Sequence, residues 1–162
     1  MIVSHKNCKG TSMIELMTIC VLISLLSALA IPSWMNYLPK LRTQSAVRAV
    51  VATLRQARSQ SICEKKCYGI FFDVSNKNFV LFLDKVNPGG GVHDTGDSTV
   101  TSTPFGQSVA FGSTTLTGST VVFDMNGAAS QSGTVTLTTS DGTRSYTIDI
   151  LAATGRVKTT ST

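Results

Sequence analysis

Residues 11 to 31 read TSMIELMTICVLISLLSALAI, an apolar run of 21 residues in which Glu15 is the only charged side chain. A helix rises about 1.5 Å per residue, so this run is long enough to cross the roughly 30 Å hydrocarbon core of a bilayer. The ten residues before it, MIVSHKNCKG, are short and basic and end in Gly10. The segment predicts a membrane anchor or a secretory signal, whose small-x-small cleavage motif is present at residues 27–30.

Glu15 favours a more specific interpretation. A carboxylate inside an apolar span costs about 2.5 kcal/mol or more near the bilayer centre and marks a function by default. A plain anchor gains nothing from it, whereas a helix that later packs among identical helices can pair the carboxylate with a neighbour's free N-terminal amine. That pairing requires a new terminus close to Glu15. It therefore predicts cleavage after Gly10, which leaves Glu15 as the fifth residue of the new chain.

The segment Gly10-Thr11-Ser12-Met13-Ile14-Glu15-Leu16 resembles the class III prepilin signal of type IV pilins and type II secretion pseudopilins. The run Ala30-Ile31-Pro32-Ser33 is similar to the same family, in which a proline loosens the helix. The resemblance implies that an inner-membrane prepilin peptidase cuts after Gly10 and methylates the new N-terminus at Thr11. The family usually has phenylalanine where this chain has Thr11, a departure that bears on methylation more than on cleavage.

The helix is expected to continue beyond Pro32, which would kink it because proline removes a backbone hydrogen bond. Apolar residues then recur at three- and four-residue steps at Val47, Val50, Leu54 and Ala57, which predicts an amphipathic helix to about residue 62. Between residues 34 and 63 there are five basic residues and no acidic one. A surplus of this size supports contacts with acidic partners without identifying them.

The remainder of the chain is rich in strand-forming residues and turns. Residues 68–74 and 79–83 predict a hairpin, and residues 87–107 predict a long mobile loop that opens with Asn87-Pro88-Gly89. Further strands are predicted at 120–125, 133–139, 144–151 and 155–158, with turns at Asn126-Gly127 and Asp141-Gly142. The fold class is α+β, with one long helix packed on an antiparallel sheet head.

Three short motifs resemble the GspH/FimT group of minor pilins and pseudopilins. They are Leu54-Arg55-Gln56-Ala57-Arg58-Ser59, then Val122-Phe123-Asp124 followed by Gly127, and finally Gly155-Arg156-Val157-Lys158. Their order along the chain matches that group. The resemblance implies a pilin fold whose head has two small sheets against the helix.

Two of the four cysteines are candidates for a disulfide bridge. Cys8 lies in the leader and Cys20 in the apolar run, which leaves Cys63 and Cys67 in the head. A bridge is plausible if the head is exported. The C-x3-C spacing does not suit a regular helix, so the bridge requires the helix to end between the two residues, and two free thiols are the alternative.

No catalytic, cofactor or metal site is predicted. His93 lies in the glycine-rich loop near Asp94 and Asp97, but such loops are usually solvated and preorganised sites prefer rigid elements. No nucleophile motif and no phosphate-binding glycine loop are present. A second Cys/His pair that would complete a zinc site is also missing.

The basic residues near the C-terminus allow two interpretations. The first is an edge strand whose charges discourage aggregation between sheets. The second is DNA binding, because some FimT-like pilins use a basic C-terminal Gly-Arg-x-Arg motif for DNA capture, and Lys158 keeps the charge of its last position but not the bidentate fork. Arg144, Arg156 and Lys158 would then form a phosphate-binding patch with salt-sensitive affinity.

These observations predict a leader at residues 1–10, a transmembrane and filament-core segment at 11–32, and a periplasmic head at 33–162. The expected function is a minor pilin or pseudopilin of the bacterial inner membrane, single-pass, assembled at low copy near the tip of a type IV pilus or a type II secretion pseudopilus. Its expected partners are the prepilin peptidase, the other pilins of the filament and the inner-membrane assembly platform. The alternatives are a DNA receptor for DNA uptake and, less favoured, a signal-anchored secreted β-rich enzyme.

Overall fold

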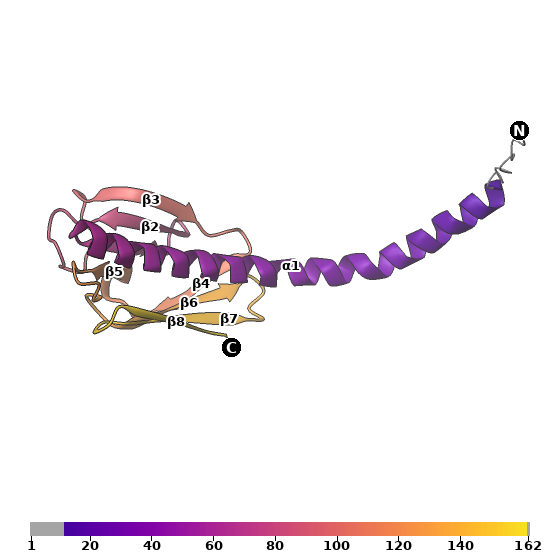
Figure 1. The fold of residues 1–162 in the computed structure, drawn as a ribbon. Helices are drawn as coiled ribbons and strands as arrows, with labels where there is room; N and C mark the ends of the chain where they lie inside the picture. The colour runs from indigo at the N-terminus through magenta and orange to yellow at the C-terminus, as the bar shows by residue number, and fades with distance from the viewer. Residues whose placement is uncertain (1–11, 162) are drawn as a thin grey trace, which may run out of the picture. The chain divides into compact units, whose positions relative to one another are not determined.

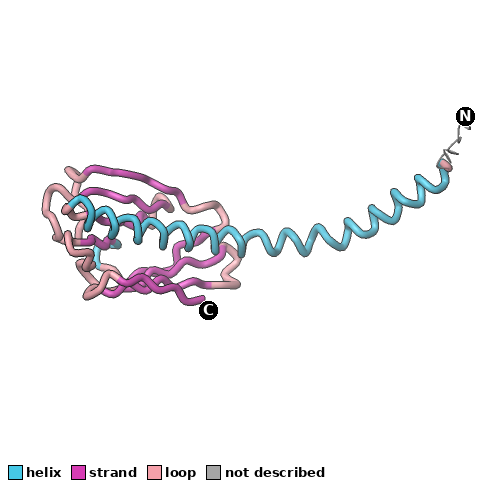
Figure 2. The backbone as a smooth tube through the Cα atoms, viewed as in Figure 1, coloured by secondary structure: helices cyan, strands magenta, loops and turns pink. Residues whose placement is uncertain are grey.

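The computed structural model describes residues 12–161, and within its helix the side chains of residues 29–33 and 36 lie outside that description. Within this range one long helix precedes eight strands and a turn of 3-10 helix (Figures 1 and 2). The helix, α1, spans Met13–Glu64, which confirms the long helix predicted up to about residue 62. Two compact units divide within α1, the first ending at Tyr37 and the second beginning at Leu38.

Two four-stranded antiparallel sheets form the β part of the second unit. Sheet A has the order β3-β2-β1-β5, formed by Ser98–Pro104, Asn78–Leu83, Tyr68–Asp73 and Thr120–Phe123. Sheet B has the order β4-β6-β7-β8, formed by Val109–Thr114, Gly133–Thr139, Ser145–Leu151 and Arg156–Ser161. The 3-10 turn η1, Thr117–Ser119, lies between β4 and β5. The α+β fold with an antiparallel head is therefore confirmed.

The hairpin and the later strands lie where the sequence placed them. β1 and β2 pair from Tyr68 opposite Leu83 to Asp73 opposite Asn78. The predicted turns at Gly127 and Gly142 have φ of +82° and +70°, a region that glycine occupies without steric cost. β8 extends to Ser161, three residues beyond the predicted end of the last strand.

The prediction of one long loop over residues 87–107 is wrong for its second half. Residues 98–104 form β3, which pairs with β2 at the edge of sheet A. Most side chains of β3 are exposed, so the apolar alternation that usually reveals a strand is missing. The β-branched threonines and Val100 were the signal that could have found it. β4, which follows this loop, was not predicted either.

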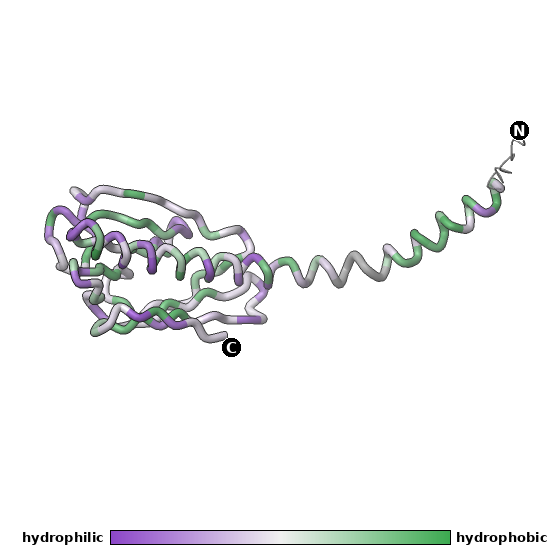
Figure 3. Tube along the Cα trace, viewed as in Figure 1, coloured by the Kyte–Doolittle hydropathy of each residue, from purple (hydrophilic) through white to green (hydrophobic). Residues whose placement is uncertain are grey.

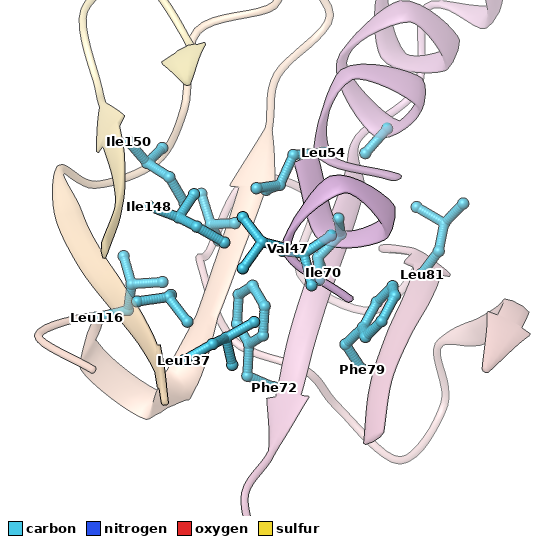
Figure 4. Packing of buried hydrophobic residues seen from close by; sticks show 14 of the residues in the cluster. Val47, Leu54, Ile70, Phe72, Phe79, Leu81, Leu116, Leu137, Ile148 and Ile150 are labelled. Atoms are coloured by element: carbon cyan, nitrogen blue, oxygen red, sulfur yellow. The ribbon is translucent and has the colours of Figure 1, made fainter. Parts of the chain in front are cut away.

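The core lies between the two sheets and the second half of α1. Val47, Val50, Leu54 and Ala57 are 0–5% exposed and form the stripe that the periodicity predicted. Figure 4 shows Val47 and Leu54 pointing among side chains of both sheets, with Ile70, Phe72, Phe79 and Leu81 from sheet A and Leu137, Ile148 and Ile150 from sheet B. Since each fully buried side chain of this size contributes about 1.5–3 kcal/mol, this stripe fixes the head on the helix.

The three family-like motifs meet at one junction. The side chain of Arg58 in α1 donates its Nε proton to the carbonyl oxygen of Gly127 at 3.0 Å. Asp124 shapes the turn that presents this carbonyl, because its Oδ1 accepts the N–H groups of Asn126 at 2.9 Å and Ala128 at 2.8 Å. Gly155, buried with φ of +59°, packs against the same carbonyl and against Arg58. The helix, the 124–128 turn and the start of β8 are thus held together at this point.

Replacing Gly155 with alanine tests the junction. A Cβ at Gly155 would collide with the carbonyl oxygen of Gly127 and would also occupy a left-handed conformation. Gly142→Ala is the matched control, because Gly142 has φ of +70° but no heavy atom within 4 Å of an added Cβ. The control should lose about 1–2 kcal/mol from backbone strain alone. Gly155→Ala should lose roughly 1–3 kcal/mol more from overpacking.

Chemical unfolding of the full chain in detergent micelles, followed by circular dichroism, measures both variants. Equal destabilisation by Gly155→Ala and Gly142→Ala would show that the close approach at Gly127 contributes nothing.

Candidate functional site

The first unit exposes apolar side chains around the whole circumference of its helix. Large apolar residues from Met13 to Leu26 are 47–83% exposed, and they occupy successive positions rather than one stripe. Figure 3 shows this stretch as predominantly hydrophobic. A helix that is apolar on all sides needs lipid or other apolar surfaces around it.

Glu15 lies in the first turn of α1 with an exposed side chain. The predicted cleavage residues Gly10 and Thr11 lie outside the described residues. Pro32 is part of α1, but its side chain lies outside the description, and the kink stays a prediction. In the part of the chain that the structure describes, no helix is both long enough and apolar enough to cross a membrane.

The helix ends between the two head cysteines, as a bridge between them would require. α1 stops at Glu64, and Lys65 takes a left-handed φ of +54°. The hydroxyl of Tyr68 donates to Glu64 Oε2 at 2.6 Å, and this hydrogen bond raises the pKa of Tyr68 to about 12. Both thiols are free in the structure, with Cys63 exposed and Cys67 buried, so the bridge stays a prediction.

The His93 loop packs on sheet A instead of lying free in solvent. The imidazole of His93 stacks on Phe71 at 5.1 Å and meets the ring of Phe82 edge-on at 4.6 Å. Asp97 accepts backbone N–H groups from Lys85 at 2.9 Å and Asp94 at 2.8 Å. Burial acts to raise the pKa of Asp97, but these hydrogen bonds outweigh it and the pKa is lowered. Among the described residues, no group of three or more His, Cys, Asp or Glu side chains could hold a metal ion.

The three basic residues predicted to contact DNA do not gather in one patch. Arg144 directly precedes β7, whereas Arg156 pairs with Leu151 at the opposite end of that strand. Seven residues of extended strand separate these two ends by about 23 Å. Lys158 shares the face of Arg156 but lies opposite Asp149, which places a carboxylate beside it. Arg156 and Lys158 remain as a pair, and contact with DNA stays a prediction.

A groove runs between α1 and β8, the edge strand of sheet B. Its largest hollow, of about 600 Å³, is lined on α1 by Arg55, Arg58 and Ile62 and on the other side by Gly155, Arg156 and Val157. Two further hollows, of about 300 and 210 Å³, continue the groove, and Val47, Arg48 and Thr159 line both of them. Together these three hollows are called the α1–β8 groove below.

The groove combines unneutralised arginines with an unpaired strand edge. Arg48, Arg55 and Arg156 are exposed. Within residues 12–161, the only ion pair joins Lys66 to Glu64, outside the groove. β8 pairs with β7 on one side, and no described strand pairs with its other side. Sequence reasoning found the basic residues of the helix but missed the groove, because the groove depends on β8 lying about one hundred residues further along the chain.

An apolar helix that carries one carboxylate and continues into a two-sheet α+β head defines a pilin-like subunit. Residues 46–154 match the family model of type II transport protein GspH, and the chain belongs to this family. The family is one of structural pseudopilin subunits of type II secretion, which agrees with the expectation that the chain is not an enzyme.

A solved structure with the same fold is that of the minor pseudopilin EpsH from the Type 2 Secretion System of Vibrio cholerae. The TM-score is 0.51 at 11% sequence identity, and the match covers 75% of this chain and 95% of the EpsH chain. At this identity the likeness concerns the fold, a long helix on antiparallel sheets.

Alkylation of the two head cysteines tests their predicted difference. Burial raises the pKa of the Cys67 thiol, with smaller contributions from the negative charges of Asp84 and Asp124. Because the thiolate is the reactive form, Cys67 should be alkylated at least about tenfold more slowly than Cys63 in the reduced, folded chain. Peptide mapping by mass spectrometry gives both rates.

Equal rates for the reduced thiols would contradict the burial of Cys67. The same experiment without reductant tests the predicted bridge, since a bridge would block both cysteines until a reductant is added.

Proposed function

We propose that this chain is a minor pseudopilin that is inserted in the inner membrane, cut after Gly10, and assembled at low copy near the tip of the type II secretion pseudopilus. The observation that carries the proposal is the first half of α1, which is apolar on all sides and carries a single carboxylate. The family match supports the choice of a type II secretion machine over a type IV pilus. The EpsH structure, described as that of a minor pseudopilin, supports the low-copy role.

Glu15 is best explained by pairing with the terminal amine of Thr11 on an adjacent subunit. Its place in the first helical turn complements the helix dipole, which contributes about 0.3–1 kcal/mol. That gain is smaller than the cost of a carboxylate deep in the hydrocarbon core, which reaches roughly 2.5–3.5 kcal/mol at the bilayer centre. A charge pairing that forms only among subunits offsets the rest of this cost, and it therefore favours extraction of the subunit from lipid into the filament.

The partners follow from this sequence of events. The prepilin peptidase acts on residues 10 and 11 and methylates the new terminus. Other pseudopilins surround the apolar half of α1, and the inner-membrane assembly platform delivers the subunit to them. Pro32 lowers the cost of local helix melting as the subunits pack. The head remains outside the cytoplasm and presents its surface to neighbouring subunits.

The site of cleavage is tested by Gly10→Ala, with Lys9→Ala as the matched control in the same leader. The wild-type chain and the control should begin at Thr11 and carry one added methyl group, whereas Gly10→Ala should retain the leader. Mass spectrometry of the N-terminal peptide from membranes measures this. Unchanged processing of Gly10→Ala would refute the role of the peptidase, and a mature terminus near Ala30 would favour the signal-anchored enzyme.

The assembly role of Glu15 is tested by Glu15→Ala and Glu15→Gln. Both should insert normally, because each makes the helix less polar, yet both should reduce incorporation into sheared pseudopili by at least about tenfold, the equivalent of a lost charge pair. Thr18→Ala is the control, because the Thr18 hydroxyl only donates to the carbonyl of Ile14 in the same helix, at 2.8 Å. Normal incorporation of both Glu15 variants would count against the pairing.

A further inference from the structure

The α1–β8 groove is continuous, and its charged lining has one sign. Arg55 lines the first and second hollows, and Arg48 lines the second and third. The remaining charged residues of the lining are Arg58 and Arg156, so no acidic side chain faces the groove. The side chain of Arg58 is occupied by its hydrogen bond to Gly127, whereas the side chains of Arg48, Arg55 and Arg156 have no hydrogen-bond or ion-pair partner among the described residues.

The floor of the groove is apolar. Val47, Val51 and Ile62 line it from α1, and Val157 lines it from β8. Ile62 is 39% exposed although it extends the apolar stripe of the helix. A ligand that fits this groove therefore presents negative charges to the rim and apolar groups to the floor.

The wall formed by β8 is a free strand edge. Its outward N–H and C=O groups are a template for another strand. A neighbouring chain that adds a strand here gains main-chain hydrogen bonds, and its alternate side chains reach the groove. The cations Arg156 and Lys158 on this edge repel a basic strand and attract an acidic one. The same two charges therefore select one kind of partner and exclude the other.

We propose that the α1–β8 groove binds an extended, acidic segment of a neighbouring pseudopilin, which adds as a strand to β8 and places its carboxylates against Arg48, Arg55 and Arg156. The inference rests on the proposed assembly function and names the chemistry of one partner. The eight described strands of this chain contain only two acidic residues, Asp73 and Asp149. A second copy therefore offers no strand with alternating carboxylates, which favours a different subunit as the source of the segment.

Nucleic acid fits the groove less well. A phosphate backbone would meet the arginines but leave the apolar floor unused. Base stacking needs several aromatic rings, and Tyr146 is the one aromatic side chain that lines the three hollows.

The test uses the full-length chain in detergent micelles and two fluorescent peptides, one alternating glutamate with valine and one alternating lysine with valine. The acidic peptide should bind with salt-dependent affinity, and the basic peptide should not. Arg55→Glu should weaken binding at least about tenfold, because its new carboxylate repels the carboxylates of the peptide. Arg144→Glu is the matched control, with the same charge change on an exposed residue at the far end of β7.

Any one of the following outcomes would overturn the proposal. One is equal binding of the two peptides, or equal weakening by Arg55→Glu and by Arg144→Glu. Another is unchanged hydrogen exchange of the β8 amides, residues 156–161, when the acidic peptide binds, because an added strand protects them. A further outcome is a duplex DNA probe that binds the groove arginines more tightly than the acidic peptide does. The last is a wild-type chain that already self-associates through the groove.

Peptide binding and incorporation into pseudopili, measured side by side, separate this inference from the proposed function. If the acidic peptide fails to bind while Glu15→Ala still blocks assembly, the strand-addition inference fails and the pseudopilin function stands. If the peptide binds as expected while the chain enters no pseudopilus with or without Glu15, the proposed function fails instead.

Discussion

The fold depends on a change in the apolar pattern of a single helix. From Met13 to Leu26, exposed apolar side chains occupy all sides of α1, and from Val47 onward the buried ones follow one stripe. A small β head cannot bury the first pattern, because a helix that packs against one head has only one of its faces covered. The second pattern is satisfied completely, since Val50, Leu54 and Ala57 are fully buried between the two sheets. One helix therefore carries a folded head and an apolar surface that the head does not cover.

The junction of Arg58 with Gly127 and Gly155 explains why three short, distant motifs belong together. An arginine that bonds a backbone carbonyl needs that carbonyl held in place, and Asp124 holds it by accepting two N–H groups of the turn. Gly155 must then be glycine, because any side chain would occupy the space of the carbonyl. This contact fixes the start of β8 beside α1. It therefore also determines the geometry of the groove between them.

The sequence predicted those elements whose pattern is local. The helix stripe, the β1–β2 hairpin and the glycine turns all depend on residues within a few positions of each other, and all were found. β3 was missed because both of its faces are largely exposed, so no alternation marks it. Arg144 was wrongly grouped with Arg156 because the antiparallel register of β7 and β8, invisible in the sequence, places them at opposite ends. The groove was missed because it also depends on where β8 lies, which the sequence does not show.

The arginines of α1 carry like charges that no described acidic side chain neutralises. Arg55 and Arg58 are three positions apart on α1, and like charges at that spacing cost roughly 0.2–0.5 kcal/mol. Arg58 recovers more than this through its bond to Gly127, because a hydrogen bond from a charged donor contributes about 1.5–3 kcal/mol. Arg55 and Arg48 have no such compensation among the described residues. A repulsive arrangement that the fold does not need is best explained by an interaction outside the fold, in which an acidic neighbour supplies the missing charge.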